Sequence, residues 1–172
     1  MRALYLGMAD ALDRLARLLV IALMAVMCVV VLAGVFWRYV LSDALTWTEE
    51  AGRYLMIWMG FVGVAPALRE GGHVAIDAIL DRMPAVARRA TILLARVLCV
   101  AFLAAVVGAG YMLIPRISGQ ITPVLGLSTA IPYLAIPIGA VLTIVEMGAL
   151  MIRDPEQRKH DIETETAMAV RS

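Results

Sequence analysis

Long apolar stretches separated by short polar segments dominate this chain. Charged residues are absent from residues 18–37, 54–68, 97–115 and 117–145. A helix that crosses a bilayer needs roughly 20 apolar residues at about 1.5 Å of rise per residue. The second stretch reaches that length only if the polar residues before it lie at the interface. The pattern predicts an all-α integral membrane protein with four transmembrane helices, over about 15–37, 47–69, 91–114 and 128–150.

Two further segments have weaker helical patterns. Residues 1–17 repeat apolar positions at helical spacing and place Asp10 before Arg14 and Asp13 before Arg17, the favourable order for i,i+4 pairs. We interpret them as a solvated start of the first helix, with a surface-lying amphipathic segment as the alternative. After two glycines, a polar stripe beside apolar residues predicts a short interfacial amphipathic helix between helices 2 and 3.

Composition supports the membrane assignment, and the basic residues suggest an orientation. The chain is 62% hydrophobic and 17% charged, whereas soluble domains are nearer half apolar and a quarter charged. Twelve of the 15 Lys and Arg residues lie in the N-terminal segment, the middle connection and the C-terminal tail. Basic residues are retained in the cytoplasm, so we expect both termini inside. Residues 1–152 then form one membrane domain, and 153–172 a polar cytoplasmic tail without packed structure.

Several local signals refine the helices. Thr46 and Glu49 have the spacing of a capping box at the start of helix 2, and Glu49 precedes Arg53 by four residues. A Pro- and Gly-containing outer loop over 115–128 ends at Ser128, a plausible N-cap. Glu146 is expected near the inner end of helix 4, in reach of water. Small residues predict close helix contacts at Gly60, Gly63, Ala101, Ala104, Ala105, Gly108 and Ala109.

Motifs for enzymatic or redox chemistry are missing from the sequence. It has no nucleotide-binding glycine loop and no paired-cysteine metal signature. Cys28 and Cys99 fit small packing residues. His73 and His160 both lie outside the predicted spans, which argues against haem held between helices. We therefore expect no enzyme activity, no cofactor and no metal. The first three helices also lack polar groups at mid-membrane, where a transporter holds its solute; the chain fits a partner of a transport machine better than its pathway.

The candidate functional residues bracket the second span, at its two ends. Ionisable groups near the membrane are often functional, although here they serve equally well as topology anchors. The ends are about 30 Å apart at 1.5 Å per residue, so the two groups cannot share one ligand. Each group is a candidate subunit-interface or structural contact: Arg38, Trp47, Glu49, Glu50 and Arg53 outside, Trp58 within the helix, and Arg69, His73 and Asp77 inside.

The same stretch carries a family resemblance. Arg38-Tyr39, Ser42, Trp47-Thr48-Glu49-Glu50, Arg53, Trp58, Gly63, Ala67, Arg69 and His73 with Val-Ala-Ile-Asp after it occur in an order that resembles the small membrane subunit (DctQ family) of tripartite ATP-independent periplasmic (TRAP) transporters. Tyr133–Gly139 resembles the fourth helix of that family. The likeness extends over nearly the whole chain.

The resemblance implies a three-part system in the bacterial inner membrane. A periplasmic solute-binding protein would deliver an organic anion, typically a carboxylate. A large permease subunit would transport it by ion-coupled symport, and this small subunit would extend the scaffold of the large one. Membrane lipids would be the remaining partner, and nucleic acid none. Two alternatives stay open: a four-helix membrane anchor of another complex, and a stand-alone tetraspan channel.

Overall fold

The structure, a computed structural model, describes residues 2–70 and 84–169, with side chains given up to residue 152 except at 85, 86, 88 and 89. The chain in these ranges forms four long helices: α1 (Arg2–Val40), α2 (Thr46–Arg69), α4 (Ala85–Ile117) and α5 (Ala130–Ala169). Each contains a stretch long and apolar enough to cross a membrane. The predicted all-α fold with four spans is confirmed. The predicted interfacial helix falls on 71–83, outside the described residues, and the orientation stays a prediction.

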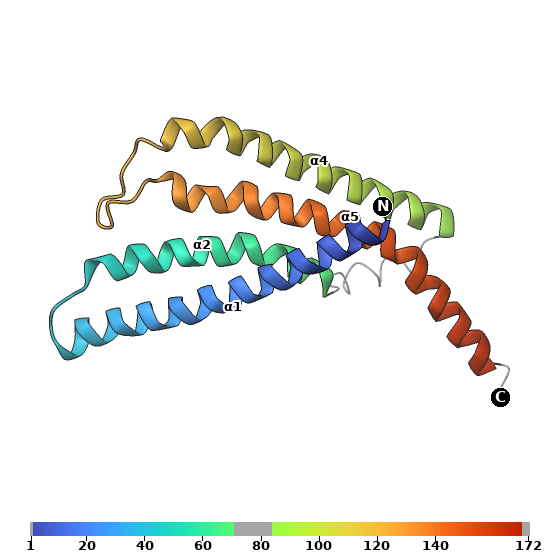
Figure 1. Ribbon diagram of the computed structural model, residues 1–172, viewed down its shortest axis with the longest axis horizontal. Helices are drawn as coiled ribbons and strands as arrows, with labels where there is room; N and C mark the ends of the chain where they lie inside the picture. The colour runs from blue at the N-terminus through green and yellow to red at the C-terminus, as the bar shows by residue number, and fades with distance from the viewer. Residues whose placement is uncertain (1, 71–83, 170–172) are drawn as a thin grey trace.

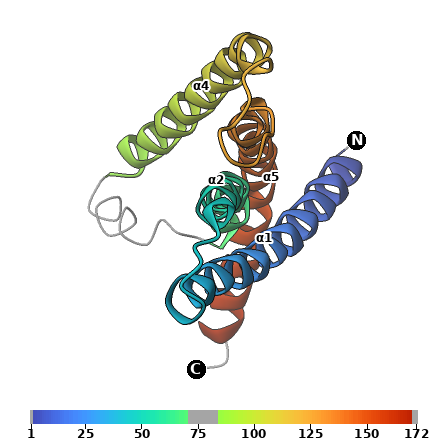
Figure 2. The same cartoon turned by 90° about the vertical axis from the view of Figure 1, so that its left-hand side faces the viewer.

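The helices form two hairpins, α1 with α2 and α4 with α5, which lie side by side (Figure 1). Seen end-on, α2 and α5 lie between α1 and α4 (Figure 2). The main contacts join α1 to α2, α2 to α5 and α5 to α4, with a smaller contact between α1 and α5. α5 is therefore the helix that touches all three others, and α4 packs chiefly against α5.

Small residues allow the helices to approach closely. The buried apolar residues are almost all alanine, with Val62 the largest fully buried side chain. At the crossing of α2 and α5, a Cβ added to Gly139 would lie 2.7 Å from the carbonyl carbon of Phe61. At the crossing of α1 and α2, a Cβ on Gly34 would lie 2.6 Å from Oγ1 of Thr48. Contacts of this kind are common where membrane helices associate without a hydrophobic driving force.

The predicted small-residue contacts are only partly correct. Gly63 lies near Val20, 3.7 Å from an added Cβ, whereas a Cβ on Gly60 would meet nothing within 4 Å. α4 meets α5 through Gly110, where an added Cβ would lie 3.0 Å from the ring of Pro137. The prediction that five small residues form a packing seam on α4 is wrong for contacts within this chain. All five are exposed: Ala101, Ala104, Ala105, Gly108 and Ala109.

Both ends of the chain differ from the sequence-based expectation. The first residues belong to α1 and are packed: Ala9, Asp13 and Ala16 are buried, and the Tyr5 hydroxyl donates to the carbonyl of Val145 at 2.9 Å. The predicted helical start of the first span is confirmed, but its solvation is wrong for the face that packs against α5. At the other end, α5 continues to Ala169, where an irregular tail was expected.

Candidate functional site

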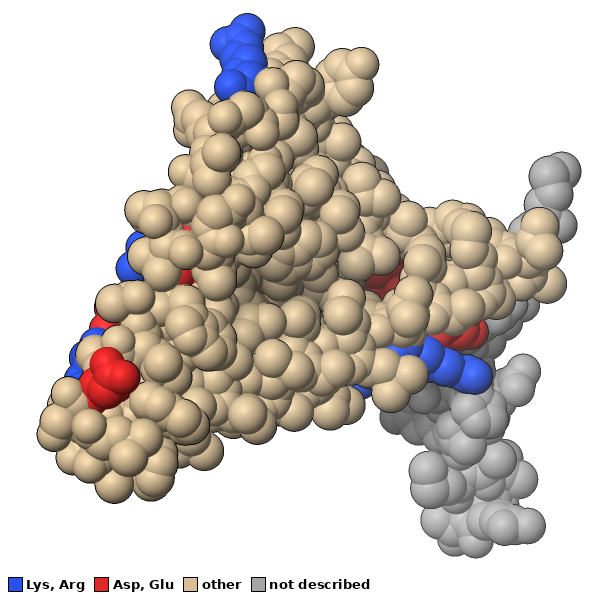
Figure 3. Space-filling model, turned by 60° about the vertical axis from the view of Figure 1, so that its left-hand side comes forward, with Lys and Arg blue, Asp and Glu red and all other residues tan. Residues whose placement is uncertain are grey.

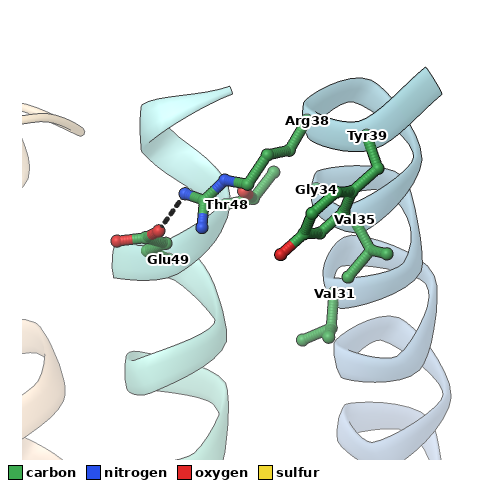
Figure 4. A pocket seen from close by; sticks show the side chains of 7 residues that line it. All are labelled: Val31, Gly34, Val35, Arg38, Tyr39, Thr48 and Glu49. Atoms are coloured by element: carbon green, nitrogen blue, oxygen red, sulfur yellow. Dashed lines mark hydrogen bonds and ion pairs between the residues drawn. The ribbon is translucent and has the colours of Figure 1, made fainter. Parts of the chain in front are cut away.

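An ion pair joins the outer ends of α1 and α2. The guanidinium of Arg38 crosses the gap between the helices and donates to the carboxylate of Glu49 (Figure 4). Both side chains are about half exposed or more, at 49% and 61%, so the pair adds little stability by itself. It closes over a groove of about 200 Å³ between the helices, lined by Val31, Gly34, Val35, Arg38, Tyr39, Thr48 and Glu49.

Two local predictions for the start of α2 are wrong. Glu49 interacts with Arg38 across the helix pair instead of with Arg53 along its own helix. The residue that precedes the helix is Leu45, and no side chain caps it. The Thr48 hydroxyl donates to the carbonyl of Leu45 at 2.7 Å. A capping box is a purely local motif, and here a tertiary ion pair takes its carboxylate.

Glu50 turns to the other side of α2 and holds the loop between α4 and α5. Its carboxylate accepts the backbone N–H groups of Val124 at 3.0 Å and Leu125 at 3.2 Å. It also accepts the hydroxyl of Tyr54 at 2.5 Å. Glu50 is 7% exposed, and hydrogen bonds from several donors are what a buried carboxylate requires. Adjacent glutamates thus connect α2 to two different parts of the chain.

The loop itself is an ordered hairpin-like turn. The Thr122 N–H donates to the carbonyl of Leu127 at 2.8 Å, and the Thr122 hydroxyl accepts the Leu127 N–H at 3.0 Å. Gly126 has φ +64°, which favours glycine. Ser128 accepts the N–H of Ala130 at 3.3 Å, so its predicted role at the start of the helix is confirmed. Glu50 therefore binds a preformed turn.

The remaining predicted outer residues take no part in these contacts. Arg53 is exposed and has no ion-pair or hydrogen-bond partner among the described residues. Trp47 is 41% exposed, and Trp58 is half-buried in the middle of α2. These three side chains belong to the surface of the isolated chain.

A second cluster joins three helices at the opposite end of α2. Arg69 donates to Asp10 and lies 3.1 Å from Oδ2 of Asp13, both on α1. Its Nε lies 3.6 Å from Oε1 of Glu146 on α5. One planar guanidinium with five donors can serve several carboxylates at once. Arg69 thereby joins α1, α2 and α5.

Arg17 extends this inner cluster. It donates to Asp13 at 2.9 Å and to Glu70 at the end of α2. The predicted pair of Asp13 with Arg17 is confirmed. The predicted pair of Asp10 with Arg14 is wrong, because Asp10 binds Arg69 instead.

Two of these carboxylates are buried. The side chains of Asp13 and Glu146 are 8% and 4% exposed, and both line a small cavity of about 10 Å³. The expectation that Glu146 reaches water is wrong, because α1 covers it. A buried charge is expensive unless a counter-ion accompanies it, and Arg69 is that counter-ion.

The sequence did not identify Asp10, Asp13, Arg17, Glu70 and Glu146 as site residues. The first three recur at spacings of three and four on α1, which places them on one helix face. Glu146 is a single carboxylate after an uncharged run that begins at residue 117. Both signals are present in the sequence, but neither says which arginine lies opposite. His73 and Asp77, predicted for this end, lie outside the described residues.

The arrangement is structural in character. On the face drawn in Figure 3, charged side chains gather at the two ends and leave a broad uncharged surface between them. Glu50 and Arg69 are separated by about 28 Å at 1.5 Å per residue. Among the described residues, no three His, Cys, Asp or Glu side chains converge to hold a metal ion. The two clusters hold helices and a loop in place at opposite membrane surfaces.

Comparison with known proteins reveals relatives along most of the chain. It is 31% identical to the ectoine TRAP transporter small permease protein TeaB of Halomonas elongata, over 80% of this chain and 73% of that protein. It is 26% identical to the sialic acid TRAP transporter small permease protein SiaQ of Vibrio cholerae, over 77% and 76%. It is 29% identical to the isethionate TRAP transporter permease protein DctMQ of Oleidesulfovibrio alaskensis, over 62% of this chain but 17% of that protein.

A family assignment agrees with these relatives. The sequence profile described as "Tripartite ATP-independent periplasmic transporters, DctQ component" matches residues 27–155, which include α2, the outer loop and the transmembrane part of α5. The relatives are subunits of transporters, so the prediction that the chain is not an enzyme is confirmed. The chain therefore belongs to the DctQ family, the small permease subunits of TRAP transporters, and is a multi-pass membrane protein.

Proposed function

We propose that this chain is the accessory subunit of a TRAP transporter and assembles with a large permease subunit that contains the solute pathway. The observation that carries the proposal is the match to DctMQ, a much longer permease protein in which the related region is 17% of the length. In that relative the counterpart of this chain is joined covalently to the rest of a permease. In this proposal, the chain contacts the corresponding part of a permease within the membrane.

The distribution of polar groups supports an accessory role. The buried polar residues lie toward the two ends: Thr48, Glu50 and Thr122 outside, and Asp13 and Glu146 inside. Thr143 lies one turn from Glu146 and donates to the carbonyl of Gly139 at 2.8 Å, so its hydroxyl is occupied. A transporter needs polar groups or broken helices near the midplane to hold its solute and ion. The described helices run unbroken through that region.

The cargo of the complete system is, in this proposal, an organic anion. The relatives are named for ectoine, sialic acid and isethionate; sialic acid carries a carboxylate and isethionate a sulfonate. The family name describes the transporters as tripartite and periplasmic, which fits delivery by a periplasmic solute-binding protein at the outer face of the inner membrane. Coupling to an ion gradient would occur in the large subunit. The two ionic clusters of this chain would keep its helices fixed as a scaffold.

Reconstitution tests this assignment. The chain is purified alone and together with the large permease subunit encoded with it, and each preparation is placed in liposomes with the cognate binding protein and an ion gradient. We expect solute uptake only from the two-subunit preparation, and stable co-purification of the two subunits. Uptake by this chain alone, or failure of the two subunits to co-purify, contradicts the proposal.

A further inference from the structure

One face of α2 is left open by the rest of the chain. Glu49, Arg53, Met56, Gly60 and Val64 are all exposed and recur every three or four residues, so they form a single stripe along the helix. We call this stripe the open face. The buried residues of α2, including Glu50, Val62 and Ala65, lie on the opposite side, toward α1 and α5.

The composition of α2 is unusual for a helix that faces lipid. Among the four described helices its membrane-length stretch is the least apolar, yet only 17% of that stretch is buried, compared with 44% for the stretch of α5. Hydrocarbon chains cannot satisfy polar groups. A helix with low hydropathy and a large exposed surface is therefore expected to contact protein. The exposed side of α4, with Leu98, Phe102 and Met112, is apolar and suits lipid.

Arg53 specifies the charge that this partner would carry. It lies six residues into the helix from Trp47, about 9 Å along the axis, and it has no ion-pair or hydrogen-bond partner among the described residues. Arg38, at the membrane edge, already has Glu49. A guanidinium near the membrane interface is readily matched by an acidic group. A carboxylate on the partner would balance the charge of the Arg53 guanidinium and accept two parallel N–H hydrogen bonds from it.

Gly60 specifies how closely the partner would approach. It lies on the same stripe, two turns further into the membrane, and a Cβ placed there would meet nothing within 4 Å. Exposed glycine in a membrane helix lets a second helix pack against the backbone itself. The other helical glycines of α2 are in contact within the chain: Gly52 with Val31 and Gly63 with Val20.

We propose that the open face of α2 is the docking surface for the large permease subunit. The subunit would present a membrane helix that packs over Gly60 and carries a carboxylate opposite Arg53. This inference rests on the proposed function, because it names the face by which the proposed partner binds.

A matched pair of glycine variants tests the location. Gly108 on α4 is also exposed, helical and free of contacts within 4 Å, so Gly60→Leu and Gly108→Leu are equivalent changes within the chain itself. Each variant is co-expressed with the large subunit, and the amount of large subunit recovered per small subunit is measured. We expect Gly60→Leu to weaken association about tenfold or more, the equivalent of one badly packed helix contact, and Gly108→Leu to match the wild type.

Arg53 variants test the chemistry. We expect Arg53→Gln to weaken association about three- to tenfold, the range for a polar contact between membrane helices, and Arg53→Lys to retain most of it. If Arg53 bound an anionic lipid instead of a carboxylate of the large subunit, the loss of association in Arg53→Gln would change with the amount of anionic lipid in the detergent mixture. That dependence would overturn the proposal.

The outcomes separate this proposal from the proposed function. If only Gly108→Leu lowers recovery of the large subunit, the interface lies on α4. If recovery is unchanged with both Gly60→Leu and Arg53→Gln, the interface does not lie on α2. In both cases the wild-type subunits still associate, and the proposed function stands. If the wild-type subunits do not associate at all, the proposed function itself fails.

Discussion

Replacement of Arg69 by methionine removes a residue that joins three helices at the inner end. Methionine keeps much of the length and apolar volume of arginine but none of its charge. The change leaves the side chains of Asp13 and Glu146, which are 8% and 4% exposed, without the guanidinium. Asp13 keeps Arg17 as a partner, and Glu146 is the more deeply buried of the two carboxylates.

The expected loss of stability is about 3 kcal/mol. Removal of one partner from a buried ion pair costs about 3–5 kcal/mol, because the other charge stays buried. The lower end of that range applies here, since the side chain of Arg69 is itself 22% exposed. A loss of this size lowers the folded-to-unfolded ratio by roughly a hundredfold. The double variant Arg69→Met with Glu146→Met should recover most of the loss, because the buried carboxylate is removed together with the guanidinium opposite it.

Reversible unfolding in mixed micelles measures this effect. The denaturing detergent is titrated while tryptophan fluorescence reports on α1 and α2, where Trp37, Trp47 and Trp58 lie, and the transition free energies of the wild type and both variants are compared. A single variant within about 0.5 kcal/mol of the wild type, the usual size of a neutral surface change, would refute the reasoning. So would a double variant as unstable as the single one.

Two further predictions concern the outer end and the crossing of α2 and α5. The two loop N–H groups that donate to Glu50 should exchange their hydrogens about tenfold faster or more in Glu50→Ala. Glu49→Ala should leave their exchange rates unchanged, and equal rates in the two variants would contradict the contact. Gly139→Ala should cost about 1–3 kcal/mol, because the new Cβ meets the backbone of Phe61. Gly60→Ala, with open space around it, should be neutral or slightly stabilising in the same unfolding assay, and the idea fails if the two variants behave alike.

The number of helices and their type followed from the sequence because membrane spans have a strong one-dimensional signal. An uncharged run of membrane length can satisfy its backbone only as a helix. The ends of the helices were less predictable. α1 begins at Arg2 and α5 continues to Ala169, and neither polar extension carries the apolar run that marks a span.

The pairing of charges was harder to predict than their presence. Arg38, Glu49, Glu50 and Arg69 were identified as candidates, and the structure gives each a tertiary contact. Which carboxylate meets which arginine depends on how α1 and α5 lie against α2, and that arrangement depends on close contacts such as the one at Gly139. Sequence spacing reports only neighbours on the same helix. It therefore favoured a pair of Glu49 with Arg53 that tertiary structure replaced.

The central position of α5 has a consequence for biosynthesis. α1 and α2 enter the membrane first and can pair as a hairpin, and Arg69 can meet the carboxylates of α1 at once. Among the described residues, α4 then has no extensive partner until α5 is inserted, and the buried inner cluster lacks Glu146 until that moment. Helices inserted one by one and associated afterwards are the usual course of membrane folding. Translation of α5 is therefore the event that turns two separate parts into one subunit.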